Sequence, residues 1–333
     1  MKKTAVLLIN VGTPDKPDVK HVRQYLSEFL NDKYVIDLPW FFRKLLVNGI
    51  IVPFRAPKST RFYEKLWTEK GSPLLYHLNS LTEKLRQKMP DNYLVISAMR
   101  YGNPSIKSAL EQIKEEHIDQ LIAIPLYPQY AASTTESAKQ HVFKQLKKSG
   151  INTDIRFIEQ FYNHPSFIRA FSEKISSYRP EDFDHVVFSY HGLPISHVQK
   201  THPEQPFNAC KCADKMPRHG AFCYKASCNE TSRLLAERLA IPKENYTTAF
   251  QSRLSKNWIQ PFTDDVLSAL AAQGSKSVLV VAPSFVADCL ETTYEIGVEY
   301  KKKFLANGGK ELVWVESLND SDSWIEALMK IVS

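Results

Sequence analysis

Short apolar runs of strand length alternate with longer stretches of helical pattern along the whole sequence. A strand, a helix and a further strand in that order build a parallel sheet with helices on its faces. The runs form two sets of four, so the sequence predicts an α/β protein with two parallel four-stranded sheets. The expected strands are 4–10, 93–98, 120–125, 154–158, 185–190, 246–250, 277–282 and 312–316.

The length of the chain supports the same division. Its 333 residues, 43% of them hydrophobic, are too many for one small domain and suit two medium ones. We expect a first domain at 1–164 and a second at 165–320, which contains a cysteine-rich segment at 208–229. A last helical stretch, 321–333, is expected to pack back on either half.

The chain is mildly basic, with a formal net charge of +7. Such an excess favours an anionic partner: a membrane surface, a ligand carboxylate or a nucleic acid. No basic run makes nucleic acid specific. The N-terminal apolar run is at the short limit for a signal peptide and no A-x-A site follows it, so we expect a cytoplasmic protein. No stretch is long and apolar enough to span a bilayer.

The most hydrophobic segment is 38–54, LPWFFRKLLVNGIIVPF. One interpretation is a core helix with a loop, because Gly49 and Pro53 are expected to limit any helix. The other is an exposed apolar lip that holds a flat ligand or touches a membrane surface. The three adjacent aromatic residues at 40–42 cannot all face one core, so the lip is as well supported as the core helix.

A row of carboxylates follows the seventh expected strand. In the helix expected from about 284 to 305, Glu291, Glu295 and Glu299 are four residues apart and share a face, one turn after Asp288. Like charges at this spacing destabilise a helix, and a solvated face is the ordinary interpretation. Open α/β sheets bind their ligands just beyond the carboxyl ends of strands. This position favours the interpretation that the carboxylates form a path along which a cation moves.

Further polar and aromatic side chains follow other strand ends. His191 ends the run VVFSYH, before a glycine and a proline that make a sharp turn. An imidazole there can take a proton or bind a metal, although a lone histidine is usually structural. Arg100 suits a ligand carboxylate, and Tyr101 and Tyr127 suit a flat ring. Residues 133–136 have capping-box spacing, which predicts the start of a helix there.

Four of the five cysteines fall close together. They are Cys210, Cys212, Cys223 and Cys228. A cytoplasmic setting disfavours disulfides, so four thiolates in a loop predict a metal site, either zinc or an iron–sulfur cluster. The spacing C-x-C-x10-C-x4-C is not that of a zinc ribbon, which favours iron–sulfur and keeps zinc as the alternative. Cys289, beside the carboxylates, is expected to be a packed side chain.

Several motifs together resemble those of one family, ferrochelatase. They are LLINVGTP (7–14), VRQYLSEFL (22–30), YEKLW with GSPLL (63–75), MRYGNPSI (99–106), PLYPQY with STTES (125–137), YHGLP (190–194), FQSR…W…PFTDD (250–265) and SFVADCLETTYEI (284–296). They follow the family's order and span nearly the whole chain. The resemblance implies a metal chelatase (a lyase) that inserts ferrous iron into protoporphyrin IX, the terminal step of haem biosynthesis. It also implies two Rossmann-like domains with the active-site cleft between them.

The resemblance implies roles for particular residues. His191 would be the catalytic base and Glu291 its partner carboxylate. The substrate Fe²⁺ would be held by His191, Glu291, Asp288 and Glu295. The expected substrate-binding residues are Arg100, Tyr101, Tyr127, Trp40 and Phe41. A [2Fe-2S] cluster would be held by Cys210, Cys212, Cys223 and Cys228, as in a bacterial subgroup with an internal cysteine segment.

Two positions depart from the family pattern, and several alternatives stay open. Glu136 stands where many members have glycine, and Cys289 stands where some have histidine. The expected partners are protoporphyrin IX and ferrous iron, with a peripheral contact at the inner face of a membrane and no nucleic acid, in a monomer or homodimer. One alternative is a chelatase of the same fold that takes coproporphyrin or another tetrapyrrole. A different class of protein, a metal-binding regulator that binds nucleic acid, is the other.

Overall fold

A computed structural model describes residues 2–201, 206–218 and 220–333. The chain forms two compact units. The first comprises residues up to 127, residues 132–160 and the last two residues, and the second comprises 128–131 and 161–331. The expected boundary after residue 164 falls just inside the second unit, and nearly all of the C-terminal helix α12 (Asp322–Val332) groups with that unit.

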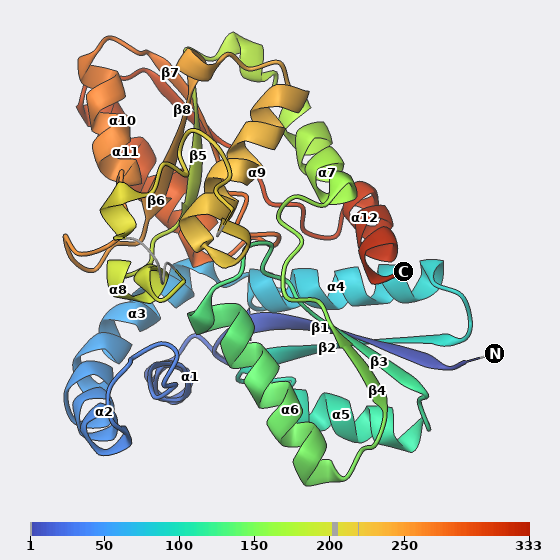
Figure 1. Ribbon diagram of the computed structural model, residues 1–333. Helices are drawn as coiled ribbons and strands as arrows, with labels where there is room; N and C mark the ends of the chain where they lie inside the picture. The colour runs from blue at the N-terminus through green and yellow to red at the C-terminus, as the bar shows by residue number, and fades with distance from the viewer. Residues whose placement is uncertain (1, 202–205, 219) are drawn as a thin grey trace. The chain divides into compact units, whose positions relative to one another are not determined.

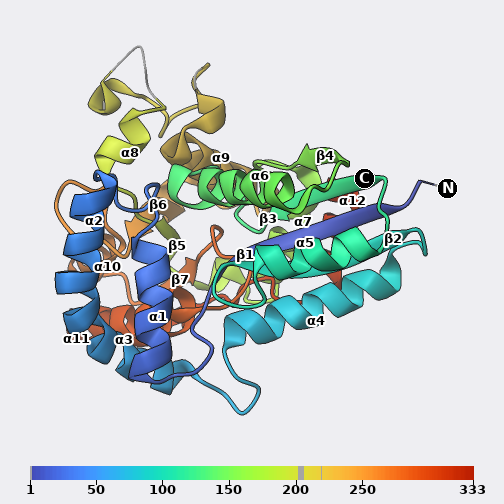
Figure 2. The ribbon, with the colours of Figure 1, turned by 90° about the horizontal axis from the view of Figure 1, so that it is seen from below.

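The sheet of the first unit is all parallel, with the strand order β2-β1-β3-β4. Its strands are β1 (Thr4–Gly12), β2 (Tyr93–Tyr101), β3 (Gln120–Pro125) and β4 (Asp154–Phe157). Helix α4 (Pro73–Lys88) covers one face, and α5 (Ile106–Glu115) and α6 (Ser137–Ser149) cover the other (Figures 1 and 2). Because both faces are covered, the central strand β1 is a nearly continuous apolar run, as parallel strands usually are.

The sheet of the second unit repeats this plan in the order β6-β5-β7-β8. Its strands are β5 (His185–His191), β6 (Tyr246–Gln251), β7 (Ser277–Val281) and β8 (Glu311–Trp314). Helices α10 (Thr263–Ala272) and α11 (Lys301–Ala306) pack on one face, and α7 (Pro165–Ser176) and α9 (Tyr224–Arg238) lie on the other (Figure 1). The predicted α/β class, with eight strands in two parallel sheets, is therefore confirmed.

The segment predicted as either a core helix or a lip is one long exposed helix. Helix α2 (Trp40–Leu46), the π-helix η1 (Val47–Ile51) and α3 (Val52–Leu66) follow one another without a break, after α1 (Val19–Leu30). The expectation that Gly49 and Pro53 limit the helix is wrong. Pro53 has no N–H to donate to the preceding turn. That turn, η1, already has π-helical geometry, so the helix continues without this hydrogen bond.

The exposed side chains of this helix are large and apolar. They are Trp40, Phe41, Phe42, Leu45, Ile50 and Phe54, each more than half exposed. The opposite face packs in the core through Val47, Val52 and Ala56. The exposure expected of a lip is present, and its contact with a ligand or a membrane stays a prediction. Among the described helices, none is long and apolar enough to cross a membrane.

Two predicted helix starts are wrong. The capping box at 133–136 does not cap α6, because the chain is already helical in the π-helix η2 (Ala132–Glu136). The helix expected from 284 begins only near the π-helix η7 (Glu291–Tyr300). Asp288 explains the delay: its N–H donates to Asn319 Oδ1 at 2.9 Å, so this main-chain group is used outside any helix.

Candidate active site

His191 lies at the carboxyl end of β5 and is half-buried. Its Nδ1 is 2.6 Å from the carbonyl oxygen of Gly192. Because a carbonyl only accepts hydrogen bonds, Nδ1 carries the proton and the neutral ring keeps a lone pair on Nε2. The main chain of His191 is also held, since its N–H donates to Ser284 Oγ at 3.3 Å and its C=O accepts from the Tyr224 hydroxyl at 2.8 Å.

The turn after His191 requires a glycine. A Cβ at Gly192 would lie 2.7 Å from the carbonyl oxygen of Gln251, and the Gly192 N–H donates to that same oxygen at 2.8 Å. Beside the turn, the rings of Trp258 and Phe285 each have their centroid 6.3 Å from that of the imidazole. The close approach and the flanking rings fix where the Nε2 lone pair points.

Gln251 joins the end of β5 to the acidic helix. It is buried and pairs with His191 in register across the sheet. Its Oε1 accepts from Ser189 Oγ at 2.7 Å, and its Nε2 donates to the main-chain oxygen of Glu291 at 3.0 Å and to Glu295 Oε2 at 3.2 Å. One buried amide is therefore hydrogen-bonded both to strand β5, two residues before His191, and to the start of the carboxylate row.

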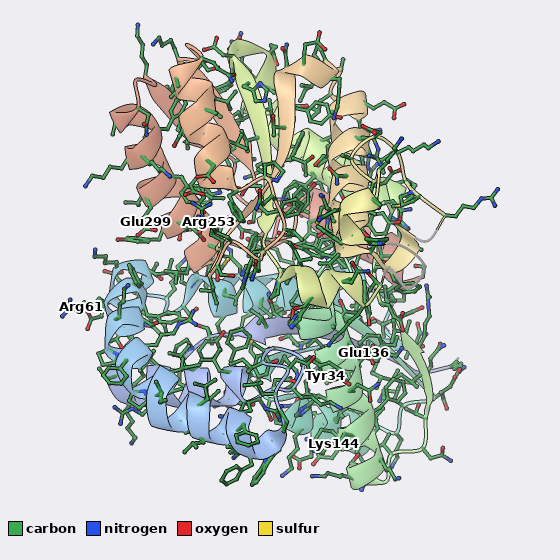
Figure 3. All side chains as sticks on the ribbon, turned by 60° about the vertical axis from the view of Figure 1, so that its left-hand side comes forward. Tyr34, Arg61, Glu136, Lys144, Arg253 and Glu299 are labelled. Carbon is green, nitrogen blue, oxygen red and sulfur yellow. The ribbon has the colours of Figure 1, made fainter. Side chains whose placement is uncertain are left out.

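The carboxylates of the row differ in their surroundings. Glu295 accepts from the Ser252 N–H at 2.9 Å, from Ser252 Oγ at 2.6 Å and from the Tyr300 hydroxyl at 2.6 Å, besides the Gln251 amide. Burial raises the pKa of Tyr300, and the charge of Glu295 raises it further. The phenol therefore stays protonated and donates its hydrogen bond to Glu295. Glu299 is exposed and projects from the same end of the unit as Arg253 (Figure 3).

Asp288 and Glu291 begin the row. Asp288 is only 6% exposed and accepts from the Ser317 N–H at 3.0 Å, from Thr292 Oγ1 at 3.2 Å and from the Asn319 amide at 2.7 Å. Glu291 lies beside the thiol of Cys289, whose pKa is raised by burial and further by the charge of Glu291. Cys289 is buried, as expected for a packed side chain.

In the first unit, Arg100 belongs to a buried polar cluster that centres on Asp32. Asp32 Oδ2 accepts from Arg100 Nη2 at 2.5 Å, from Ser137 Oγ at 2.5 Å and from the Tyr101 hydroxyl at 2.9 Å. Burial acts to raise the pKa of Asp32, but the Ser137 hydroxyl, the Tyr34 N–H and the Arg100 charge outweigh it and hold this pKa below its usual value. Asp32 therefore stays ionised as the counter-ion of Arg100.

The aromatic residues of the first unit that were expected to bind a flat ring lie in two different places. Tyr101 is 1% exposed and its hydroxyl is engaged by Asp32, so a bound ring reaches it only if this cluster opens. Tyr127 is near Arg100 and Tyr101, and its hydroxyl is buried without a hydrogen-bond partner among the described residues. Trp40 and Phe41 are instead exposed on α2. Glu136 accepts from Gln140 Nε2 at 2.8 Å and is labelled in Figure 3.

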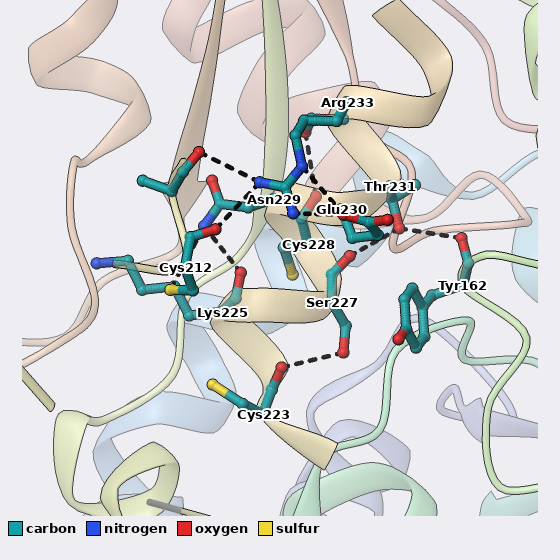
Figure 4. A network of polar contacts seen from close by, with 12 residues as sticks. Tyr162, Cys212, Cys223, Lys225, Ser227, Cys228, Asn229, Glu230, Thr231 and Arg233 are labelled. Carbon is teal, nitrogen blue, oxygen red and sulfur yellow. Dashed lines mark hydrogen bonds and ion pairs between the residues drawn. The ribbon is translucent and has the colours of Figure 1, made fainter. Parts of the chain in front are cut away.

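The cysteines form a separate group in the second unit. Cys212, Cys223 and Cys228 are buried, Cys210 is half-exposed, and none of the four forms a disulfide. Burial is the main cause that raises the pKa of Cys212 to about 12, and the neighbouring Cys210 and Cys223 contribute to this rise. The thiols of Cys223 and Cys212 likewise raise the pKa of Cys228, although burial is the larger cause. The cysteines are therefore close enough to influence one another electrostatically, and the sulfur atoms of Cys212, Cys223 and Cys228 are visible in Figure 4.

The cysteine segment differs from the loop that the sequence predicts. Helix α9 begins at Tyr224, inside the segment 208–229 that was expected to be a loop, so Cys228 is on the helix and Cys223 is at its N-cap position. Residue 219, within the expected segment, lies outside the described residues. Where the chain is described, no three His, Cys, Asp or Glu side chains are arranged to hold a metal ion.

Arg233 and Asn229 of α9 hold the segment that carries Cys212. Arg233 Nη1 donates to the carbonyl oxygens of Cys212 at 3.1 Å and Ala213 at 3.2 Å, and Asn229 Nδ2 is 3.9 Å from Cys212 Sγ (Figure 4). Glu230 pairs with the Arg233 guanidinium. Cys212 is therefore bound to the helix that contains Cys228 and has Cys223 at its N-cap, although ten residues lie between Cys212 and Cys223 in the sequence.

Two parallel four-stranded units, with a histidine and a carboxylate row at the carboxyl edge of one, define a protein of the chelatase fold. The structure of SirB from Bacillus subtilis with Fe³⁺ is similar, with a TM-score of 0.54 at 12% identity, covering 100% of this chain and 96% of that one. A structure of the sirohydrochlorin chelatase SirB from Bacillus subtilis subspecies spizizenii in complex with cobalt gives a TM-score of 0.51 at 13% identity, with 100% and 94% covered.

The sequence comparisons identify the family within this fold. A family model for ferrochelatase matches residues 3–333. Ferrochelatase of Legionella pneumophila (strain Lens) is 43% identical over 99% of both chains, and ferrochelatase of Coxiella burnetii (strain Dugway 5J108-111) is 39% identical over 99% of this chain and 93% of its own. The chain therefore belongs to the ferrochelatase family, the metal chelatases that insert iron into porphyrin in haem biosynthesis.

Proposed function

We propose that this chain inserts Fe²⁺ into protoporphyrin IX, with His191 as the base and Glu291 as its partner carboxylate. The observation that carries the proposal is the fixed imidazole. Nδ1 is held by the Gly192 carbonyl, so Nε2 is the basic nitrogen. The strand end that presents it is joined through Gln251 to the helix that begins with Glu291.

The reaction needs these groups. A porphyrin loses two pyrrole protons and gains one ferrous ion, with no change in oxidation state. A base within reach of a pyrrole N–H lowers the barrier to the first loss, and a carboxylate nearby favours the imidazolium that forms. Asp288 and Glu295 are proposed on the route of the ion, where Fe²⁺ would compete with the donors that their oxygens now accept.

The choice of porphyrin is tested by direct competition. Equal concentrations of protoporphyrin IX and coproporphyrin are offered with limiting Fe²⁺ in the absence of oxygen, and the two haems are separated and quantified. We expect protohaem to form faster. Faster formation of coprohaem would assign the chain to the coproporphyrin alternative while leaving iron insertion as its activity.

We propose that the porphyrin is bound by Arg100, Tyr101, Tyr127, Trp40 and Phe41. Trp40 is 65% exposed and Phe41 63%, so both can cover a flat apolar ring without a rearrangement of the core. Arg100 would bind a porphyrin carboxylate by exchanging its present counter-ion, Asp32, for it. The same exposed aromatic surface, with Lys44 on the helix, is proposed to touch the inner face of a membrane in a cytoplasmic protein.

Replacing Trp40 and Phe41 together with serine is expected to raise the porphyrin KM about tenfold and leave kcat nearly unchanged. Tenfold corresponds to about 1.4 kcal/mol, a modest loss of apolar contact for two aromatic side chains. The control is Leu305→Ser, which removes an exposed apolar side chain from α11 of the second unit. Sedimentation with anionic liposomes measures the membrane contact. Unchanged KM and unchanged liposome binding would show that the lip serves neither purpose.

We propose that Cys210, Cys212, Cys223 and Cys228 hold one [2Fe-2S] cluster, with zinc as the alternative. The chemistry of the donor set supports it. Cys210 and Cys223 raise the pKa of Cys212, and Cys223 and Cys212 raise the pKa of Cys228, so these thiols suit a cation that thiolates share. The hydrogen bond from Arg233 to the main-chain oxygen of Cys212 also supports the cluster proposal, because it holds this segment to α9. When bound, the cluster would join the 210–212 segment to α9.

A further inference from the structure

Tyr224 stands between the cysteine group and the proposed base. It is the first residue of α9, directly after Cys223, and it is 6% exposed. Its hydroxyl donates to the main-chain oxygen of His191 at 2.8 Å. The helix that carries two of the four cysteines is thus joined by a single phenol to the last peptide of β5.

Other contacts hold the same histidine. Ser284 Oγ accepts from the His191 N–H at 3.3 Å, and the Gly192 carbonyl oxygen is 2.6 Å from Nδ1. The bond to the His191 carbonyl comes from a side chain of α9.

We propose that Tyr224 is a positioning residue that fixes His191 to α9. With the phenol on the carbonyl of His191, the end of β5 and its Nε2 stay where Ser284 and Gly192 also hold them. Loss of the phenol hydroxyl removes one of these restraints, and the imidazole shifts. The inference rests on the proposed function only in treating His191 as the base.

The experiment is a nitrogen NMR spectrum of the complete protein, as isolated, with ¹⁵N-labelled histidine. The His191 signals are assigned by their loss in His191→Ala. Tyr224→Phe is expected to shift these signals and to lower kcat about tenfold to a hundredfold, as loss of an outer hydrogen bond typically does, with the porphyrin KM within twofold of wild type.

Tyr190→Phe is the matched control. Tyr190 is a fully buried tyrosine directly before His191, and its hydroxyl is 3.0 Å from Ser232 Oγ on the same helix α9. The variant loses a buried phenol bond between β5 and α9 without touching the His191 carbonyl. We expect its His191 signals and its kcat to match wild type. If Tyr190→Phe and Tyr224→Phe change the His191 signals and kcat equally, Tyr224 contributes only to packing and has no positioning role.

Wild-type His191 signals and wild-type kcat in Tyr224→Phe overturn the proposal. If Tyr224→Phe does not fold, Tyr224→Met decides, because it also removes the hydroxyl and methionine adapts to irregular core space. Unshifted His191 signals in that variant overturn the proposal.

These outcomes are separable from failure of the proposed function. Full iron insertion by His191→Ala would show that His191 is not the base. The His191 signals would still report whether Tyr224 sets the position of its ring, because the spectrum needs neither iron nor porphyrin. Conversely, an inactive His191→Ala with unshifted signals in Tyr224→Phe would remove only the positioning role.

Discussion

His191→Ala is expected to abolish iron insertion while porphyrin binding survives. The substitution removes the Nε2 lone pair that the Gly192 carbonyl keeps available, and positioned general bases contribute about 10²–10⁴ in rate. We expect kcat to fall about a thousandfold and the Kd for porphyrin, measured by fluorescence quenching, to change less than threefold. Binding survives because the ring-contacting side chains proposed here lie on other elements.

The control for this variant lies on the same strand. His185 opens β5, is buried, and has its Nε2 2.9 Å from Thr247 Oγ1. Burial lowers the pKa of His185, as expected for a structural histidine. His185→Gln keeps a hydrogen-bonding side chain there and is expected to retain turnover. Near-normal kcat in His191→Ala would falsify the assignment of the base.

Each single change of Cys210, Cys212, Cys223 or Cys228 to serine is expected to remove the metal centre and lower thermal stability. The energy with which a metal centre binds stabilises the fold of the segment that carries it. A loss of about 3 kcal/mol would lower Tm by roughly 6–12 °C for a unit of this size. Visible absorption, iron and sulfide analysis and a thermal melt measure the three consequences.

Cys289→Ser is the matched control for the cysteine series. Cys289 is buried beside Glu291 and is not among the neighbours that raise the pKa of Cys212 or Cys228. We expect this variant to keep the colour and the metal content of wild type. Stoichiometric zinc without acid-labile sulfide would contradict the iron–sulfur assignment and retain a four-thiolate site. Loss of colour in Cys289→Ser would require a different ligand set.

The strands were predictable because their sequence pattern has one physical cause. A strand covered by helices on both faces needs apolar side chains throughout, and β1 and β5 carry such runs. The positions of His191 and Arg100 followed from the same logic, because parallel strands end at a common edge. Their presence at strand ends is local information that one sequence contains.

The π-helices were not predictable in this way. A helical pattern does not distinguish i+4 from i+5 hydrogen bonding, and the choice depends on distant partners. The late start of η7 depends on Asn319, which lies 31 positions after Asp288 in the sequence. Its side-chain oxygen accepts a hydrogen bond from the Asp288 N–H. The prediction that Gly49 and Pro53 limit the helix failed for the same reason. A π-helical turn accommodates a glycine and a following proline that would interrupt an ordinary α-helix.

Two residues of the site were missed because their importance lies in distant contacts. Asp32 follows the end of α1 and looks like an ordinary surface acid, but its partner Arg100 is 68 residues away. Tyr224 follows a cysteine and looks like one more aromatic, but it donates to His191, 33 residues earlier. No periodicity marks either residue, so only the fold reveals them.

The unbroken helix from Trp40 to Leu66 has a consequence for how a porphyrin arrives. Its main-chain hydrogen bonding leaves no loop between the aromatic side chains and the rest of the helix that would have to close over a ligand. The entropy cost of ordering this surface is therefore met when the chain folds and not when the ligand binds. Only side-chain rotations are left to adapt to the ring, and these occur within picoseconds to nanoseconds for exposed residues.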